Sequence, residues 1–191
     1  MTNLHWTLGD VRDYADRAHR SVNQRRKFTG EPYLVHPLAV TGLVATVEGH
    51  TKEMLAAAIL HDVPDDVGSR RRDGPHRYDI DEIRSLFGPI VARYVMQLSN
   101  VSTPHDGDRA ARMALERAHT AQADPEVKTI KLADVISNTI SVVVVDREFA
   151  HTYLPEKKLL LEELREGDPG LLRMASDIVE RGLAELAGHG N

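Results

Sequence analysis

The sequence contains no cysteine among its 191 residues. A chain without thiols forms no disulfide, thiolate zinc site or iron–sulfur cluster, and it has no cysteine nucleophile. Any metal must therefore be bound by histidine, aspartate or glutamate. The ten histidines provide enough nitrogen donors for such a site.

Aromatic residues and positive charge are also scarce. Aromatic residues make up 5% of the chain, and 24 Lys and Arg stand against 29 Asp and Glu, for a net charge of −5. General nucleic-acid binding needs a concentrated cationic face, and single-strand binding needs aromatic rings on which bases stack. We therefore expect no nucleic-acid partner.

Long apolar runs are absent. The longest, residues 140–145, includes Ser141 and is much shorter than the roughly 20 residues that cross a bilayer. The first ten residues, MTNLHWTLGD, are polar and carry no apolar core of signal-peptide length. We expect a cytoplasmic protein with no membrane partner, and the length favours a single domain over residues 1–191.

Hydrophobic periodicity predicts an all-α fold of about eight or nine helices. Apolar and small residues recur at three- and four-residue steps, whereas period-two alternation is missing. Thr51 is a candidate N-cap, and Pro37 suits a first helical position. The β-branched residues 142–145 have no partner strand and are interpreted as buried helix. The predicted helices are 8–22, 38–47, 54–63, 83–98, 110–121, 127–145, 153–164 and 171–186, with loops at 68–78 and 99–107.

Four residues stand out as candidate metal ligands. His61 and Asp62 end an apolar helix, and together they offer an imidazole nitrogen and a carboxylate oxygen. His36 precedes Pro37 at a helix start. Asp134 lies in an apolar helix, where an unpaired carboxylate is costly, and it shares a face with Asn138. Either a metal or an ion pair, for example with Lys131, satisfies Asp134.

The order His36, His61-Asp62, Asp134 resembles the H…HD…D signature of the HD superfamily of metal-dependent phosphohydrolases. Three segments narrow the resemblance to the hydrolase domain of RelA/SpoT proteins and their small stand-alone relatives, including the metazoan SpoT homologs. These segments are NQRRKFTGEPYLVHP, LAAAILHDVPDD and IKLADVISN. The phrase DEIRSLFGPIV also resembles a helix of that family. The resemblance covers about residues 10–165 and implies a compact HD-domain fold.

The resemblance also implies roles for individual residues. His36, His61, Asp62 and Asp134 would bind one metal ion, usually manganese. The family's Glu-Asp pair, which positions and activates the attacking water, falls on Asp65 and Asp66. Its substrate-binding residues fall on Arg26, Lys27 and Asn138. The implied activity is removal of the 3′-pyrophosphate from ppGpp, an alarmone of the stringent response. The chain has no room for a downstream synthetase domain, so we expect degradation alone.

The sequence departs from the family pattern at several positions. Asp65 stands where the family has Glu, which shortens the side chain by one methylene. The segment after Asp66 is longer and more basic, with Arg70, Arg71 and Arg72, and is either a phosphate-binding lid or a solvated loop. An Arg two residues after Asn138 is missing. A one-residue shift before Gly30 leaves it open whether Arg26 or Lys27 contacts phosphate.

Two further functions compete with ppGpp hydrolysis. The first is another HD-type nucleotide phosphohydrolase, acting on the 2′-phosphate of NADPH or on deoxynucleoside monophosphates. The second is a catalytically weak nucleotide-binding module, which the Asp65 substitution and the missing Arg would favour. All three share the metal ligands.

Overall fold

The computed structural model describes residues 5–27, 29–68 and 76–188, and this part of the chain is built from α-helices. Its one extended pairing is an isolated bridge between Arg25 and Pro32. The predicted all-α fold is therefore confirmed. The helices are α1 (Leu8–Ser21), α2 (Val35–Val44), α3 (Lys52–Leu60), α4 (Ile80–Phe87), α5 (Pro89–Leu98), α6 (Arg109–Ala121), α7 (Pro125–Val145), α8 (Arg147–Glu163) and α9 (Pro169–Gly188), with a short π-helical turn, η1 (Pro64–Gly68).

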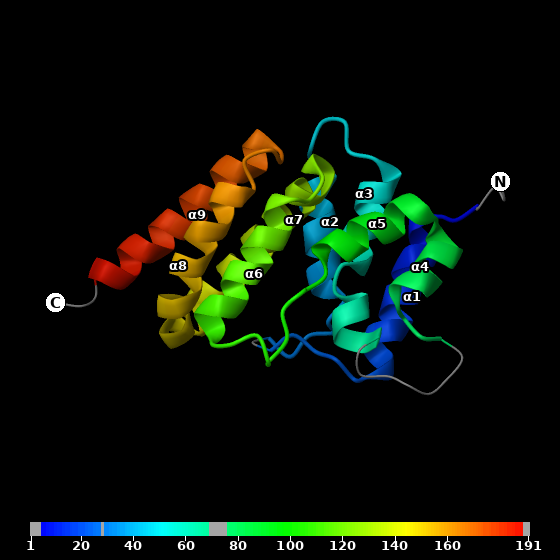
Figure 1. Cartoon of the computed structure of the whole chain (residues 1–191), viewed down its shortest axis with the longest axis horizontal. Helices are drawn as coiled ribbons and strands as arrows, with labels where there is room; N and C mark the ends of the chain where they lie inside the picture. Colours follow the sequence, from blue (N-terminus) through cyan, green and yellow to red (C-terminus); the bar gives the residue numbers. More distant parts are fainter. Residues whose placement is uncertain (1–4, 28, 69–75, 189–191) are drawn as a thin grey trace. The chain divides into compact units, whose positions relative to one another are not determined.

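The chain divides into two compact units, Met1–Ser99 and Asn100–Asn191. In the first unit, α3 packs against α1, α2 and α5, and α4 packs against α5 (Figure 1). Three consecutive alanines of α3, Ala56, Ala57 and Ala58, are fully buried. Their small side chains let neighbouring helices approach α3 closely, so the C-terminal half of α3 is closely packed within the first unit. The predicted single domain remains a prediction.

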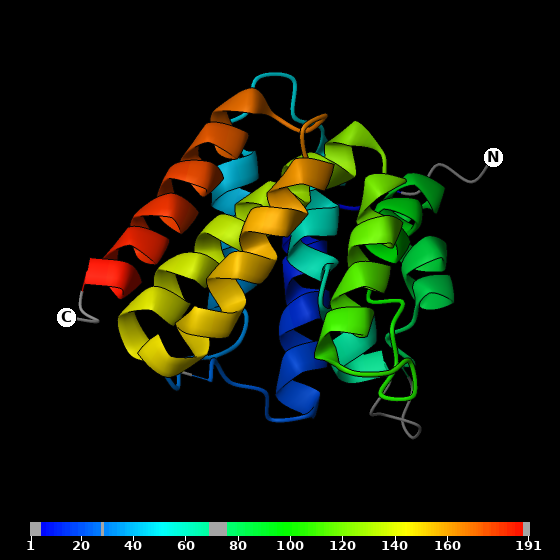
Figure 2. The same ribbon diagram turned by 60° about the vertical axis from the view of Figure 1, so that its left-hand side comes forward.

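The second unit contains α6 to α9. Helix α7 packs against α8 and α9, and α8 also packs against α6 (Figure 2). Gly182 of α9 marks a close approach, because a Cβ atom there would lie 2.9 Å from Cδ1 of Leu154. Residues 142–145 are helical, as interpreted from the sequence, since they form the last turn of α7.

Some helix boundaries differ from the prediction. The segment 83–98 is two helices, because Gly88 has a φ of +96° and Pro89 starts a new helix. Helix α8 begins at Arg147 rather than at 153. Its N-cap is Asp146, whose side chain accepts a hydrogen bond from the Phe149 N–H. Helix α2 begins at Val35, so Pro37 is its third residue instead of its first. Its missing N–H still falls among the donors that a helix start leaves without an internal acceptor.

The two predicted loops are described to different extents. Residues 99–107 form no helix, as expected. The basic residues Arg70, Arg71 and Arg72 lie outside the described residues. Along the described part of the chain, no helix has the length and apolar character that crossing a membrane requires.

Candidate metal centre

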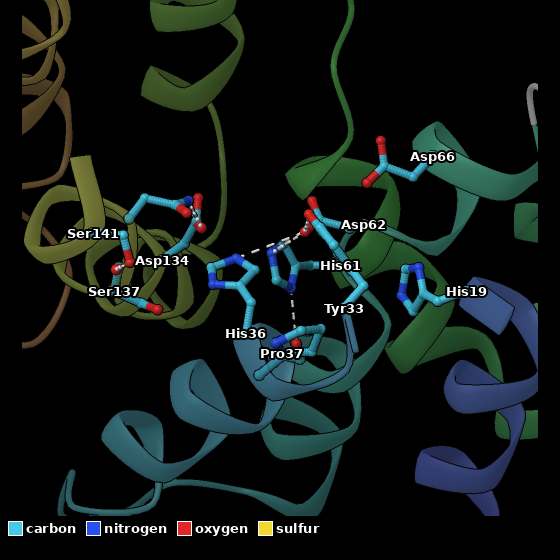
Figure 3. A network of polar contacts seen from close by, with 12 residues as sticks. His19, Tyr33, His36, Pro37, His61, Asp62, Asp66, Asp134, Ser137 and Ser141 are labelled. Atoms are coloured by element: carbon cyan, nitrogen blue, oxygen red, sulfur yellow. Dashed lines mark hydrogen bonds and ion pairs between the residues drawn. The ribbon is translucent and has the colours of Figure 1, made fainter. Parts of the chain in front are cut away.

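The first unit brings two histidines to one carboxylate. The Nε2 atom of His61 lies 3.0 Å from Oδ2 of Asp62, and Nε2 of His36 lies 3.7 Å from the same oxygen. Donor nitrogens of the two histidines lie within 4.8 Å of each other. His36 and His61 are 2% and 3% exposed. Figure 3 shows both rings directed toward Asp62. Within the first unit, three of the four predicted ligands thus lie together, one on α2 and two directly after the last residue of α3.

The hydrogen bond of the second ring nitrogen defines the His61 tautomer. Nδ1 of His61 lies 2.8 Å from the backbone oxygen of Ala58, which can only accept, so Nδ1 donates its proton there. In the neutral imidazole, Nε2 then presents a lone pair toward the Asp62 carboxylate. A histidine that binds metal commonly donates its other N–H to a carbonyl in this way. The Nε2 lone pair and the Asp62 oxygen, 3.0 Å apart, repel each other unless a cation or a proton lies between them. These residues fit a divalent metal.

A residue that the sequence reasoning missed also contacts Asp62. The Tyr33 hydroxyl donates a hydrogen bond of 2.7 Å to Oδ2 of Asp62. Its ring stacks at a tilt against His19, with centroids 4.7 Å apart. Tyr33 lies just before α2, in the PYLVHP segment, so its place three residues before His36 was the available signal. Its hydroxyl orients the carboxylate that His36 and His61 face.

The predicted catalytic pair lies in η1. Asp65 and Asp66 are both partly buried there, and the Asp66 N–H donates to the Asp62 carbonyl at 2.9 Å. Short π-helical turns recur at functional sites. Oδ2 of Asp66 accepts a hydrogen bond of 2.6 Å from Nε2 of Gln24. Gln24 in turn contacts His19, and the sequence had assigned no role to either residue.

The two predicted phosphate-binding cations lie on a loop closed like a hairpin. The Arg26 N–H donates to the Glu31 carbonyl at 2.9 Å, and the Gly30 N–H donates to the Arg26 carbonyl at 3.0 Å. Gly30 has a φ of +70°, which explains why glycine suits this turn. Arg26 is partly buried and Lys27 is exposed, so Lys27 is the more accessible of the two cations.

The fourth predicted ligand belongs to the second unit. Asp134 is buried on α7, where Oδ1 accepts a hydrogen bond of 2.7 Å from Asn138 and Oδ2 lies 3.3 Å from the Lys131 ammonium. The shared face predicted for Asp134 and Asn138 is thus present, and so is the ion pair with Lys131.

On α8, burial and then the nearby Lys131 charge lower the pKa of Lys157 to about 8.

Comparison with known proteins decides the family. The model of the family described as "HD domain" matches residues 12–156, which is most of the chain. The chain belongs to the HD domain family.

Curated relatives of this HD protein are named for alarmone metabolism. It is 31% identical over 174 residues to a GTP pyrophosphokinase of Streptomyces antibioticus, covering 91% of the present chain but 18% of that protein. It is 33% identical over 133 residues to human guanosine-3′,5′-bis(diphosphate) 3′-pyrophosphohydrolase MESH1, covering 69% of the present chain and 66% of MESH1. The chain therefore spans about a fifth of the length of its long bacterial relatives.

A solved structure resembles this HD protein over nearly its whole length. The structure is described as "A metazoan ortholog of SpoT hydrolyzes ppGpp and plays a role in starvation responses". The TM-score is 0.76 at 25% sequence identity, and the match covers 95% of the present chain and 98% of the other. The HD-domain fold predicted from the motifs is therefore confirmed.

Proposed function

We propose that this HD protein is a metal-dependent hydrolase that removes the 3′-pyrophosphate from ppGpp or a closely related nucleotide. The carrying observation is the meeting of His36 and His61 at Asp62, whose donor atoms suit a divalent ion. The substrate class is supported by human MESH1, which is named for this activity. The solved metazoan SpoT ortholog, described as hydrolysing ppGpp, supports it as well.

The metal in this proposal is manganese, held by His36, His61, Asp62 and Asp134. Neutral imidazole and carboxylate ligands suit a borderline divalent ion, and the His61 tautomer presents the required lone pair. Asp134 is included among the proposed ligands because it completes the H…HD…D order. It lies within residues 12–156, which the family model matches. Such an ion, when bound, lowers the pKa of a coordinated water and neutralises charge on a phosphoryl oxygen.

The chain's own residues then perform the remaining tasks. Asp66 in η1 accepts a proton from the attacking water or orients it, and Asp65 assists. Arg26 and Lys27, on their closed loop, pair with phosphate oxygens of the substrate. Asn138 contacts the substrate from α7. Tyr33 keeps Asp62 oriented through its hydroxyl.

The direct test is release of pyrophosphate from ppGpp by the purified full chain, with manganese or with chelator. We expect release with manganese, none with chelator, and none from the Asp62→Ala variant with manganese. The matched control is Asp13→Ala, which removes an exposed carboxylate of α1 and should keep wild-type activity. Manganese bound by the wild type without any pyrophosphate release would contradict the proposed substrate. A panel including NADPH and deoxynucleoside monophosphates would then be assayed.

A further inference from the structure

The end of α1 holds His19 and Gln24 in a defined register. Asn23 has a φ of +50°, a left-handed conformation that asparagine tolerates better than most residues. Its N–H donates to the Arg20 carbonyl at 3.0 Å, and the Gln24 N–H donates to the His19 carbonyl at 2.9 Å. These two bonds form a Schellman motif. The backbone itself therefore brings the Gln24 side chain back beside His19.

The hydrogen bonds of the Gln24 side chain have only one consistent direction. Its Nε2 lies 2.6 Å from Oδ2 of Asp66, and its Oε1 lies 2.8 Å from Nδ1 of His19. A carboxylate oxygen can only accept, so the amide nitrogen must face Asp66. The amide oxygen then faces His19, and His19 must carry its proton on Nδ1. Asp66 thus determines the Gln24 orientation, which in turn determines the His19 tautomer.

His19 is built into the core of the first unit rather than exposed to solvent. It is 2% exposed, and burial lowers the pKa of its imidazole below the usual value, which keeps the ring neutral. Within the described residues, its buried Nε2 has no hydrogen-bond partner, which agrees with a proton on Nδ1. The Tyr33 ring packs against it (Figure 3). His19 is thus a fixed donor that cannot easily turn away from Gln24.

We propose that His19 and Gln24 are positioning residues that aim the Asp66 carboxylate at the attacking water. The inference rests on the proposed function, in which Asp66 handles that water. Gln24 holds Oδ2 of Asp66 in place, which leaves Oδ1 to accept from the water. His19 prevents the Gln24 amide from rotating. A misplaced base lowers the rate of a reaction far more than it lowers substrate affinity.

A double-mutant cycle tests whether Gln24 acts through Asp66. Gln24→Leu in the full chain should lower kcat for ppGpp roughly tenfold, the usual scale for loss of an orienting hydrogen bond, with KM and manganese affinity nearly unchanged. Asp66→Ala should lower kcat by about a hundredfold or more. The double variant should match Asp66→Ala within about twofold, because interacting residues are not additive. Gln122→Leu, at the exposed end of α6, is the matched control and should behave like the wild type.

Two substitutions of His19 separate hydrogen bonding from packing. Asn carries its amide nitrogen at the same distance along the side chain as Nδ1 of histidine, so His19→Asn retains a donor for Gln24. His19→Leu fills the core better but removes the donor. We expect His19→Asn to keep a higher kcat than His19→Leu, although thermal unfolding should rank the leucine variant as more stable. A purely structural role would give the opposite order of kcat.

The outcomes distinguish this inference from the proposed function. Absence of ppGpp turnover by the wild type overturns ppGpp as the substrate, and the same variants are then compared on the nucleotide of the panel that the chain hydrolyses. Absence of turnover of every nucleotide in the panel overturns both. Turnover combined with an additive double variant, or with His19→Leu more active than His19→Asn, overturns the positioning role alone. A substrate-independent measurement is the ¹⁵N NMR spectrum of the His19 ring. It should show the proton on Nδ1, and a proton on Nε2 would contradict the inference.

Discussion

The Tyr33 hydroxyl helps to orient the carboxylate that we propose as a metal ligand. The Tyr33 hydroxyl donates to the same Asp62 oxygen that His36 and His61 face. Without this bond Asp62 gains rotational freedom, which raises the entropy lost on metal binding. Interactions just outside a ligand set usually contribute a factor of 10 to 100 in metal affinity.

Tyr33→Phe should therefore weaken manganese binding about tenfold while leaving the fold intact. Isothermal titration calorimetry of the metal-free chain measures this change. The matched control is Tyr14→Phe, which removes another partly buried hydroxyl of the first unit, one bonded to Glu82 instead of to Asp62. Equal affinity of the two variants for manganese would show that the Tyr33 hydroxyl plays no part in orienting Asp62.

The low pKa of Lys157 makes stability depend on pH. In the folded chain burial and the Lys131 charge bring this pKa to about 8, against 10.5 for a solvated lysine. Between these values the unfolded chain binds more protons, so the free energy of unfolding should rise with pH. Lys157→Met should be more stable than the wild type at pH 7, and the difference should vanish near pH 10.5.

Urea denaturation of the metal-free chain at several pH values checks this expectation. Lys158→Met serves as the control, because Lys158 is the exposed neighbour on the same helix. A constant difference between Lys157→Met and the wild type from pH 7 to 10.5 would contradict the burial of the Lys157 charge.

At the residue scale, motifs identified candidates but not their hydrogen-bond partners. The sequence singled out His61 and Asp62, since an adjacent pair at the end of an apolar helix is a local pattern. The roles of Tyr33, His19 and Gln24 could not be predicted, because they depend on contacts across 29 and 42 residues of sequence to Asp62 and Asp66. Such contacts arise only once the helices have packed.

Helix ends decide how the first unit is divided into elements. Thr51 accepts from the Met54 N–H at 3.2 Å, so the predicted N-cap of α3 is confirmed. The division between α4 and α5 depends on Gly88, with φ of +96° and ψ of 168°. This backbone region is open almost only to glycine. Gly88 is therefore both the residue that ends α4 and the residue that precedes α5, and its backbone conformation separates the two helices.

Gly88→Ala should lower the free energy of unfolding by about 1–3 kcal/mol. The added Cβ would meet no atom within 4 Å, so the loss comes from backbone strain and not from a clash. Gly42→Ala is the matched control, because Gly42 lies inside α2 with equal space around it. That change should instead stabilise by roughly 0.5–1 kcal/mol. A Gly88→Ala chain as stable as the wild type in chemical denaturation would refute the strain.

At the element scale the sequence predicted helices well and some of their ends poorly. Periodicity identified helices over most of the chain because their apolar faces repeat at helical steps. It merged α4 with α5, since the apolar pattern continues through Gly88 and Pro89 while the backbone turns. It also placed the start of α8 too late, because residues 147–152 carry few apolar side chains and depend on the Asp146 cap.

At the scale of the whole molecule, the proposed ligand set draws on both compact units. His36, His61 and Asp62 belong to the first, and Asp134 belongs to the second. The family model likewise spans residues of both units, from 12 to 156. A metal ion bound by all four residues would link the stability of α3 to that of α7.

Manganese should therefore slow hydrogen exchange in both α3 and α7. Manganese at a concentration of a hundred times its Kd stabilises the folded chain by about 2.7 kcal/mol. This gain should appear as slower exchange in each helix that carries or adjoins a residue that binds the ion. Asp134→Ala should abolish the protection of α7, whereas Asp177→Ala, which removes an exposed carboxylate of α9, should preserve it. Mass spectrometry of exchanged peptides with manganese or chelator provides the measurement. Protection confined to α3 in the wild type would exclude Asp134 as a ligand, and the metal would then be held by the first unit alone.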